Sequence, residues 1–209
     1  MAHYQLRVRL ALGLFVLIVG CGTQAQPPAA PVSRTISVPA AAPQQWQPET
    51  AAGPWKYVLL HHSATESGSV ASIDAEHRAR RDASGNPWRG IGYHFVIGNG
   101  HGMADGQIEP TFRWKDQSAG AHAGEATFNE QGIGICLIGN FEQAPPTEKQ
   151  LAAARRLVGY LKGEFRIPTD RVLKHGDVKA TACPGKHFPA QELARVPAVS
   201  AAPTVRVSR

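Results

Sequence analysis

Two stretches of this chain cannot build a hydrophobic core, and they confine the folded part to the middle. Residues 21–52 are rich in Ala, Pro, Gln and Thr, with few large apolar side chains and no periodicity. Such a segment cannot bury enough surface to offset its ordering entropy, so it predicts a flexible tether. Residues 194–209 predict a disordered tail for the same reason. We therefore expect one domain, over residues 53–193 of the 209.

Residues 1–20 have the organisation of an export signal. Arg7 and Arg9 precede an apolar run that ends at Gly20, and this run is too short for the roughly 20 residues that a spanning helix needs. An aliphatic residue, Val and Gly then stand directly before Cys21, which resembles the lipobox of bacterial lipoproteins. Acylation of Cys21 would anchor the chain, since each buried methylene contributes about 0.8 kcal/mol. An ordinary signal peptide with an incidental cysteine is the alternative.

We therefore expect a periplasmic protein, attached to a membrane through its lipid. The residue after Cys21 is Gly22 rather than aspartate, which by resemblance to the sorting pattern of Gram-negative lipoproteins favours the outer membrane. Export leaves Cys136 and Cys183 in an oxidising compartment, where one disulfide is possible. However, Cys136 lies in a β-rich run typical of a buried central strand, whereas Cys183 lies in a polar loop before Pro184. We expect both thiols to stay free.

The net charge indicates the kind of partner. The chain carries a formal charge of +6, which falls to +4 when Arg7 and Arg9 leave with the signal segment. Nucleic acid, an anionic membrane surface and an acidic polymer all suit a basic protein. Export argues against nucleic acid, and there is no cluster of Lys and Arg with interleaved aromatic residues. We expect the partner to be an anionic cell-wall polymer. We also expect the protein to be a monomer.

The pattern of the middle segment predicts a mixed α/β domain. Short apolar strands are expected over residues 56–61, 93–97 and 132–139, with another that begins at Ile108. A polar helix is expected over residues 72–81. The strongest helix signal begins at Thr147, where Thr147 and Gln150 occupy capping-box positions ahead of an apolar stripe.

Three side chains predict a metal site. His61 follows the first strand, and His175 and Cys183 stand eight residues apart near the end of the domain. Two imidazoles and a thiolate are good zinc ligands, and a zinc with three protein ligands keeps its fourth position for water. This arrangement is typical of hydrolases. We expect His62 to be a packed or hydrogen-bonding neighbour, because a fourth protein ligand would close the water position.

Five separated motifs carry a resemblance to a known family. In chain order they are Leu59-Leu-His61-His62-Ser-Ala-Thr65, Gly92-Tyr-His-Phe95, His122-Ala123, Asn129 with the run Gly132 to Phe141, and His175-Gly-Asp-Val followed by Ala-Cys183-Pro-Gly185. Together they resemble the type-2 N-acetylmuramoyl-L-alanine amidases, which are similar to the peptidoglycan recognition proteins and to a phage lysozyme with amidase activity. The resemblance covers roughly residues 55–190. It implies a central mixed β-sheet flanked by helices, with a zinc cleft on one face.

The resemblance also implies roles for individual residues. His61, His175 and Cys183 match the three zinc ligands. Tyr93 matches the tyrosine that lies beside the zinc water and helps to position or stabilise the tetrahedral oxyanion. It is the first catalytic candidate, because loss of such a donor typically costs 100- to 1,000-fold in rate.

Three further residues are substrate-binding candidates. His122 and Asn129 match residues that line the groove for muramic acid and the stem peptide. His94 is placed with them. If residues 93–97 form a strand, His94 and Tyr93 point to opposite faces, so they cannot both face the metal.

The chain departs from its relatives at two positions near the expected metal. Thr181 stands where the phage enzyme has a lysine; several catalytic recognition proteins also have a threonine there. Lys179 is close enough in sequence for its side chain to reach the metal site. Cys136 stands where the cytoplasmic recycling amidases carry a catalytic glutamate. No general base is therefore identified by motif, and Thr181 is the second catalytic candidate.

These expectations converge on a lipid-anchored, zinc-dependent amidase. It would hydrolyse the amide between the lactyl group of N-acetylmuramic acid and L-alanine in peptidoglycan. The alternative is a non-catalytic peptidoglycan-binding lipoprotein. Recognition proteins that only bind typically lack the cysteine ligand, so Cys183 favours the enzyme. An effector amidase aimed at competitors is disfavoured, since a lipid-anchored toxin cannot be exported further.

Overall fold

A computed structural model describes residues 43–82 and 84–199 of the chain. The predictions for the signal segment, Cys21, most of the tether and residues 200–209 therefore lie outside the described residues. Within the described ranges, no helix has the length and apolar character that crossing a bilayer requires.

A five-stranded mixed sheet forms the centre of the domain, in the order β3-β2-β4-β1-β5. Its strands are β1 (Tyr57–His62), β2 (Phe95–Ile97), β3 (Ile108–Pro110), β4 (Gly132–Leu137) and β5 (Val172–Lys174). Strand β1 runs parallel to β4 and β5, β2 runs parallel to β4, and β3 is the antiparallel edge. With helices on its flanks, this sheet confirms the predicted fold class.

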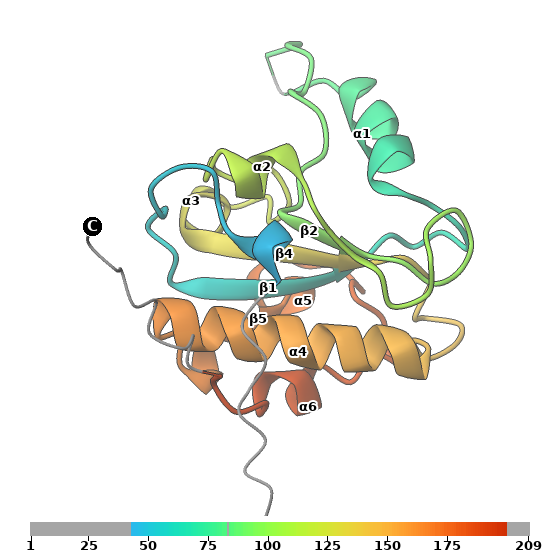
Figure 1. The fold of residues 1–209 in the computed structure, drawn as a ribbon. Coiled ribbons are helices and arrows are strands. Elements are labelled where there is room, and N and C mark those ends of the chain that lie inside the picture. The colour runs from blue at the N-terminus through green and yellow to red at the C-terminus, as the bar shows by residue number, and fades with distance from the viewer. Residues whose placement is uncertain (1–42, 83, 200–209) are drawn as a thin grey trace, which may run out of the picture. The chain divides into compact units, whose positions relative to one another are not determined.

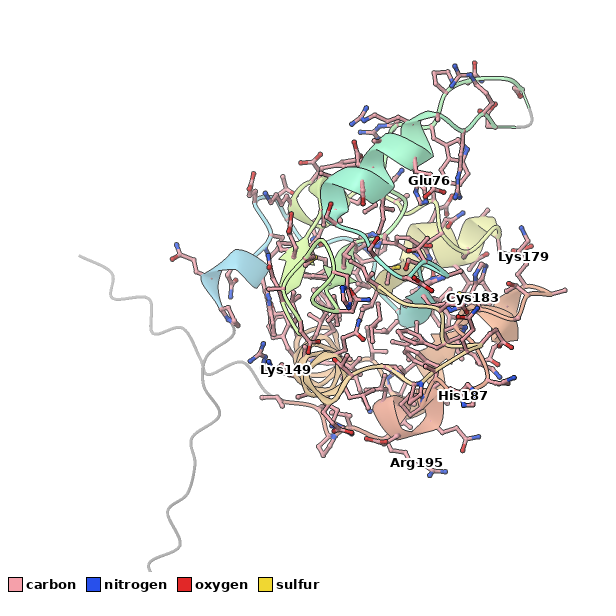
Figure 2. All side chains as sticks on the ribbon, turned by 90° about the vertical axis from the view of Figure 1, so that its right-hand side faces the viewer. Glu76, Lys149, Lys179, Cys183, His187 and Arg195 are labelled. Atoms are coloured by element: carbon pink, nitrogen blue, oxygen red, sulfur yellow. The ribbon has the colours of Figure 1, made fainter. Side chains whose placement is uncertain are left out.

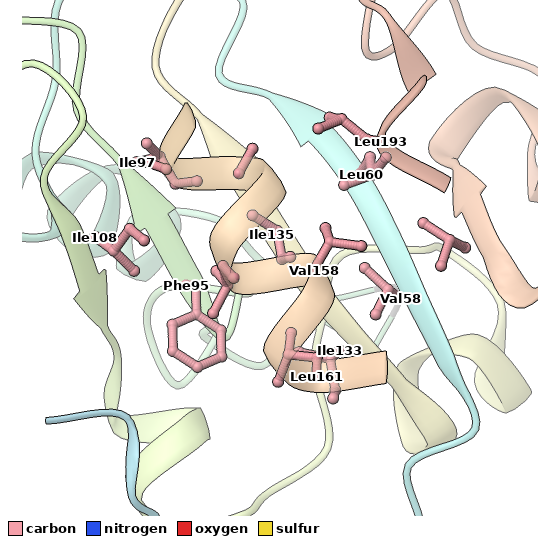
Figure 3. Packing of buried hydrophobic residues seen from close by; sticks show 14 of the residues in the cluster. Val58, Leu60, Phe95, Ile97, Ile108, Ile133, Ile135, Val158, Leu161 and Leu193 are labelled. Atoms are coloured by element: carbon pink, nitrogen blue, oxygen red, sulfur yellow. The ribbon is translucent and has the colours of Figure 1, made fainter. Parts of the chain in front are cut away.

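Helix α4 (Glu148–Phe165) covers one face of the sheet. It begins at the predicted position, because the Thr147 side chain accepts from the N–H of Gln150 and the Gln150 side chain accepts from the N–H of Thr147. Its apolar side packs on alternate strand residues, as Figure 3 shows for Val58, Leu60, Ile133, Ile135, Val158 and Leu161. Burial of this stripe fixes which strand residues face the helix.

The alternation of strand residues leaves the other set on the opposite face, where His61 pairs in register with Cys136. Helix α1 (Val70–Arg78) lies on this side of the sheet, away from α4 and α6 (Figure 1). A smaller apolar cluster holds it there, made of Ile73, Ile91, Val96, Met103 and Ile138. His61 and Cys136 therefore point away from the main core, whereas His62, on the other face of β1, packs against Phe141 of that core.

Shorter elements connect these parts: η1 (Gln44–Trp46), α2 (Phe112–Lys115), α3 (Ala126–Gln131), η2 (Thr169–Arg171), α5 (His175–Val178) and α6 (Ala190–Ala194). Helix α1 begins and ends earlier than the predicted 72–81, because Ser69 caps it in a capping box with Ser72. The strand predicted over residues 93–97 is limited to β2, so Tyr93 and His94 precede it.

Trp46 lies in the segment whose composition predicted a tether, yet its side chain is 1% exposed. Its indole lies 5.5 Å from the Tyr160 ring of α4, and its carbonyl accepts a 2.9 Å hydrogen bond from the indole N–H of Trp114. The packed part of the chain thus includes residues ahead of position 53. A single aromatic residue among Ala, Pro and Gln carries no periodic signal, so sequence reasoning did not find this contact.

Candidate metal centre

The three predicted metal ligands come from different segments and meet at one edge of the sheet. His61 is fully buried near the end of β1, His175 begins α5, and Cys183 lies in the loop beyond it. One donor atom from each lies within 4.8 Å of the others, and Cys183 Sγ is 3.8 Å from His61 Nδ1. Over residues 43–82 and 84–199, this is the only such group of His, Cys, Asp and Glu side chains.

Sheet topology explains why residues so distant in sequence meet. Strands β1 and β5 are parallel neighbours, with Leu60 opposite Lys174. A histidine follows each of these two paired residues, so His61 and His175 lie side by side, with ring centroids 4.7 Å apart. Ligands commonly bind beyond the carboxyl ends of parallel strands.

Hydrogen bonds orient both imidazoles. His61 Nε2 lies 3.1 Å from His122 Nδ1, and His175 Nε2 lies 3.3 Å from the carbonyl oxygen of Ala123. Each ring therefore directs Nε2 at a protein group and leaves Nδ1 for a metal. Tetrahedral zinc holds nitrogen at about 2.0 Å and sulfur at about 2.3 Å, which places neighbouring donors roughly 3.5 Å apart. The donor types and their spacing fit zinc.

The charge states of the three ligands also suit a bound cation. Burial, followed by the neighbouring imidazoles, lowers the pKa of His61 well below its usual value, and burial lowers the pKa of His175. Both rings are then neutral, which is the form that binds metal. Burial raises the pKa of the Cys183 thiol to about 11. Thiolate formation at neutral pH therefore requires a cation among these groups.

Tyr93 lies beside the metal ligands, with its ring centroid 5.1 Å from that of His61. Burial raises the pKa of its hydroxyl well above 10, and Cys136 and Cys183 nearby raise it further. The hydroxyl therefore stays protonated and can donate a hydrogen bond. Tyr93 also lines a pocket of about 180 Å³, together with Ser63, Thr65, Ser67, Ser72, Ile73 and Glu76. Hydroxyl groups dominate this pocket.

The loop around Cys183 places the remaining catalytic candidate. Thr181 is exposed, and its Oγ1 accepts a 3.3 Å hydrogen bond from the backbone N–H of Cys183. Lys179 packs its side chain over Gly124. Figure 2 views this side of the domain, with Cys183 and Lys179 at one edge and Glu76 of α1 above them. Thr181 thus contacts the backbone of a metal ligand.

The three predicted substrate-binding residues direct both ring nitrogens of His94 and His122 and the Oδ1 of Asn129 at protein groups. His122 is 7% exposed, and its Nε2 lies 3.2 Å from the carbonyl oxygen of Gly132. Asn129 Oδ1 accepts from the N–H groups of His122 and Ala123, each at 2.9 Å. His94 is fully buried; its Nδ1 accepts from a β4 backbone N–H and its Nε2 contacts a loop carbonyl. Their contact with substrate stays a prediction.

His62 lies outside the ligand group, as expected. Its Nδ1 accepts a 3.2 Å hydrogen bond from the backbone N–H of Phe141. Sequence reasoning missed the Ala123 carbonyl that faces His175. It also missed the close packing of His122 on β4, although Gly134 inside a strand is a signal of such an approach.

The sequence of this chain is similar to one family of known proteins. The family model described as N-acetylmuramoyl-L-alanine amidase (Amidase_2) matches residues 51–186. A peptidoglycan-recognition protein of Drosophila simulans is 32% identical over 144 residues, which are 65% of this chain and 71% of that protein.

Solved structures show the same relationship. The endolysin N-acetylmuramoyl-L-alanine amidase LysCS from Clostridium intestinale has a TM-score of 0.56 and 28% identity, over 71% of this chain and 88% of its own. A Drosophila PGRP-LB variant in complex with tracheal cytotoxin has a TM-score of 0.53 and 26% identity, over 77% of this chain and 92% of its own. The similarity therefore extends to both an amidase and a recognition protein.

Proposed function

This chain belongs to the N-acetylmuramoyl-L-alanine amidase family, and from that premise we propose that it is a zinc-dependent amidase of peptidoglycan. The bond that it cuts is the amide between the muramic acid lactyl group and L-alanine. The observation that carries this proposal is the convergence of His61, His175 and Cys183 on one point, with Tyr93 beside them. Binding alone does not require such a ligand set.

Each of these residues has a defined part in the proposed reaction. Zinc, when bound, polarises the amide carbonyl and lowers the pKa of a water molecule to about 7. His61, His175 and Cys183 would hold the ion through two neutral nitrogens and one thiolate. Tyr93 keeps its proton because of burial, so it donates a hydrogen bond to the oxygen on which negative charge develops. Thr181 fixes the backbone next to Cys183.

Peptidoglycan is the proposed substrate. The Drosophila PGRP-LB variant, which shares this fold, was solved in complex with tracheal cytotoxin. In this chain, the pocket beside Tyr93 offers four hydroxyl groups and the Glu76 carboxylate. These groups suit the sugar hydroxyls and peptide amides of a muropeptide. The net positive charge of the chain also suits an anionic wall polymer.

We also propose that the protein acts in the periplasm, tethered to a membrane through acylated Cys21. The lipobox-like sequence before Cys21 supports this location, and the Ala/Pro-rich segment that follows it would give the domain its reach. Metabolic labelling with a palmitate analogue tests the anchor. The wild type is expected to take up the label and Cys21→Ser is expected to lose it; equal labelling of both would contradict the anchor.

A non-catalytic binding protein is the alternative, and one experiment separates the two functions. The full chain, purified in detergent, is stripped of metal, and sacculi are then incubated with it before and after Zn²⁺ is added back. We expect new free amines to appear only with Zn²⁺, while co-sedimentation with sacculi persists in both samples. Co-sedimentation without any release of amines under either condition would favour the binding function.

A further inference from the structure

Buried His122 connects the metal ligand His61 to the backbone of β4. Its Nδ1 lies 3.1 Å from His61 Nε2, and its Nε2 lies 3.2 Å from the carbonyl oxygen of Gly132. The residue is 7% exposed, and its ring packs within 5.0 Å of the His61 ring, centroid to centroid. Both ring nitrogens of His122 are therefore engaged by protein groups rather than free to bind a substrate.

The carbonyl of Gly132 determines the direction of both hydrogen bonds. The Gly132 carbonyl can only accept, so His122 Nε2 carries a proton and donates it. In a neutral ring the other nitrogen, Nδ1, is then an acceptor. His61 Nε2 must therefore be the donor to it, which leaves His61 Nδ1 unprotonated and directed at Cys183. A metal on His61 Nδ1 requires this same tautomer.

Two glycines make room for the His122 ring. A Cβ on Gly134, inside β4, would lie 2.6 Å from His122 Cδ2, and a Cβ on Gly120 would lie even closer to the same ring. Real Cβ atoms are not found at such distances, so any larger residue at either position would displace the imidazole. The absence of side chains at Gly120 and Gly134 thus leaves the space that the ring needs, and its two hydrogen bonds set its orientation.

Asn129 fixes the backbone that carries these contacts. Its Oδ1 accepts from the N–H groups of both His122 and Ala123. The Ala123 carbonyl in turn accepts from His175 Nε2. The two consecutive residues His122 and Ala123 therefore orient both histidine ligands, one through a side chain and one through a carbonyl.

We propose that His122 is a positioning residue of the metal centre, which holds His61 in the tautomer that presents Nδ1 to the metal, and that Asn129 keeps this segment in place. The inference rests on the proposed zinc site. It assigns His122 and Asn129 to the support of the ligands, in addition to any contact with substrate. Loss of an outer-shell partner typically weakens metal affinity 10- to 100-fold.

The test compares two substitutions in the full chain. His122→Leu removes the acceptor for His61, whereas His122→Asn keeps one, because Asn Oδ1 and His Nδ1 are both bonded to Cγ. Zn²⁺ affinity is measured by competition with a chromophoric chelator, and the visible spectrum of the Co²⁺-loaded protein reports the ligand geometry. We expect His122→Leu to bind Zn²⁺ 10- to 100-fold more weakly with an altered Co²⁺ spectrum, and His122→Asn to recover most of the affinity.

His94→Leu is the matched control. His94 is also fully buried, and it also bonds to the β4 backbone and to a loop carbonyl. It touches His122 only through ring packing, with centroids 5.6 Å apart, and it has no hydrogen bond to a metal ligand. We expect this change to lower the melting temperature of the metal-free protein without a comparable loss of Zn²⁺ affinity. An equal loss of affinity in His94→Leu would overturn the proposal, since general packing would then explain the effect.

The remaining outcomes are also decisive. If the wild type retains no Zn²⁺, the proposed function is wrong, and the positioning role that rests on it is wrong as well. If the wild type binds Zn²⁺ and His122→Leu binds it equally well, the positioning role is wrong. If His122→Leu does not fold, Asn129→Ala provides the second test, because it leaves the imidazole in place. Unchanged Zn²⁺ affinity in Asn129→Ala would then reject the proposal.

Discussion

Cys183 is the residue that most directly divides hydrolysis from binding. It supplies the only sulfur of the metal group, and its Sγ lies 3.8 Å from His61 Nδ1. We predict that Cys183→Ser loses zinc and hydrolysis but still co-sediments with peptidoglycan, because a serine hydroxyl stays protonated at neutral pH and is a poor zinc ligand. Metal analysis of the purified variant checks the first part. Full activity in Cys183→Ser would refute the zinc assignment.

Tyr93 allows the chemical step to be separated from metal binding. It is not one of the three ligands, yet its ring centroid lies 5.1 Å from that of His61. Tyr93→Phe removes only the hydroxyl, so we predict retained zinc and a 100- to 1,000-fold lower kcat with a smaller change in KM. Steady-state kinetics on a soluble muropeptide measures this. A kcat near that of the wild type would exclude the oxyanion role.

At the scale of elements, the sequence predicted those with strong local signals. Helix α4 was found because Thr147 and Gln150 form a capping box ahead of a long apolar stripe. The three-residue strand β5 and the one-turn helix α5 were missed, since such short segments form only through their tertiary neighbours. Trp46 was missed because its partners, Tyr160 and Trp114, are distant in sequence.

The N-terminus of α4 gives a prediction at this scale. Thr147 Oγ1 accepts a 3.0 Å hydrogen bond from the N–H of Gln150 and donates one to Asp105. Thr147→Ala should lower the free energy of unfolding by about 1–2 kcal/mol, measured by urea denaturation. Thr147→Ser is the control and should retain most of the stability. Equal stability of the alanine and wild-type chains would show that the cap contributes nothing.

At the scale of the whole molecule, sequence identified which residues approach one another but not their orientation. His61, His175 and Cys183 were predicted from their types and spacing and from a family resemblance. The hydrogen bond from His61 to His122 was not predictable, because the direction of a buried ring depends on the packing of several segments at once. Gly134, a glycine inside strand β4, was a local sign of that packing.

Several buried histidines should make the metal-free protein sensitive to acid. Burial lowers the pKa of His77 to about 4 and that of His122 to about 3, and it lowers the pKa values of His61 and His94 well below 6.5. In an unfolded chain these histidines bind protons below about pH 6.5, whereas in the folded chain the buried rings stay neutral until the pH is much lower.

We therefore predict that stability is fully present above about pH 6.5 and is lost as the pH falls toward 4. Each proton taken up on unfolding contributes about 1.4 kcal/mol per pH unit to this slope. Urea denaturation between pH 5 and 7, in the presence of a chelator, measures the slope. Stability that stays constant over this range would contradict the buried, neutral state of these rings.

The most direct test of the proposed function is mass spectrometry of purified peptidoglycan digested by the full chain, with Zn²⁺ and with a chelator. We predict that intact stem peptides with a free L-alanine amine appear only in the Zn²⁺ sample, since hydrolysis at the lactyl amide releases that terminus and requires the His61–His175–Cys183 metal group. Cleavage at another bond, or the same products in the chelated sample, would contradict a zinc-dependent amidase.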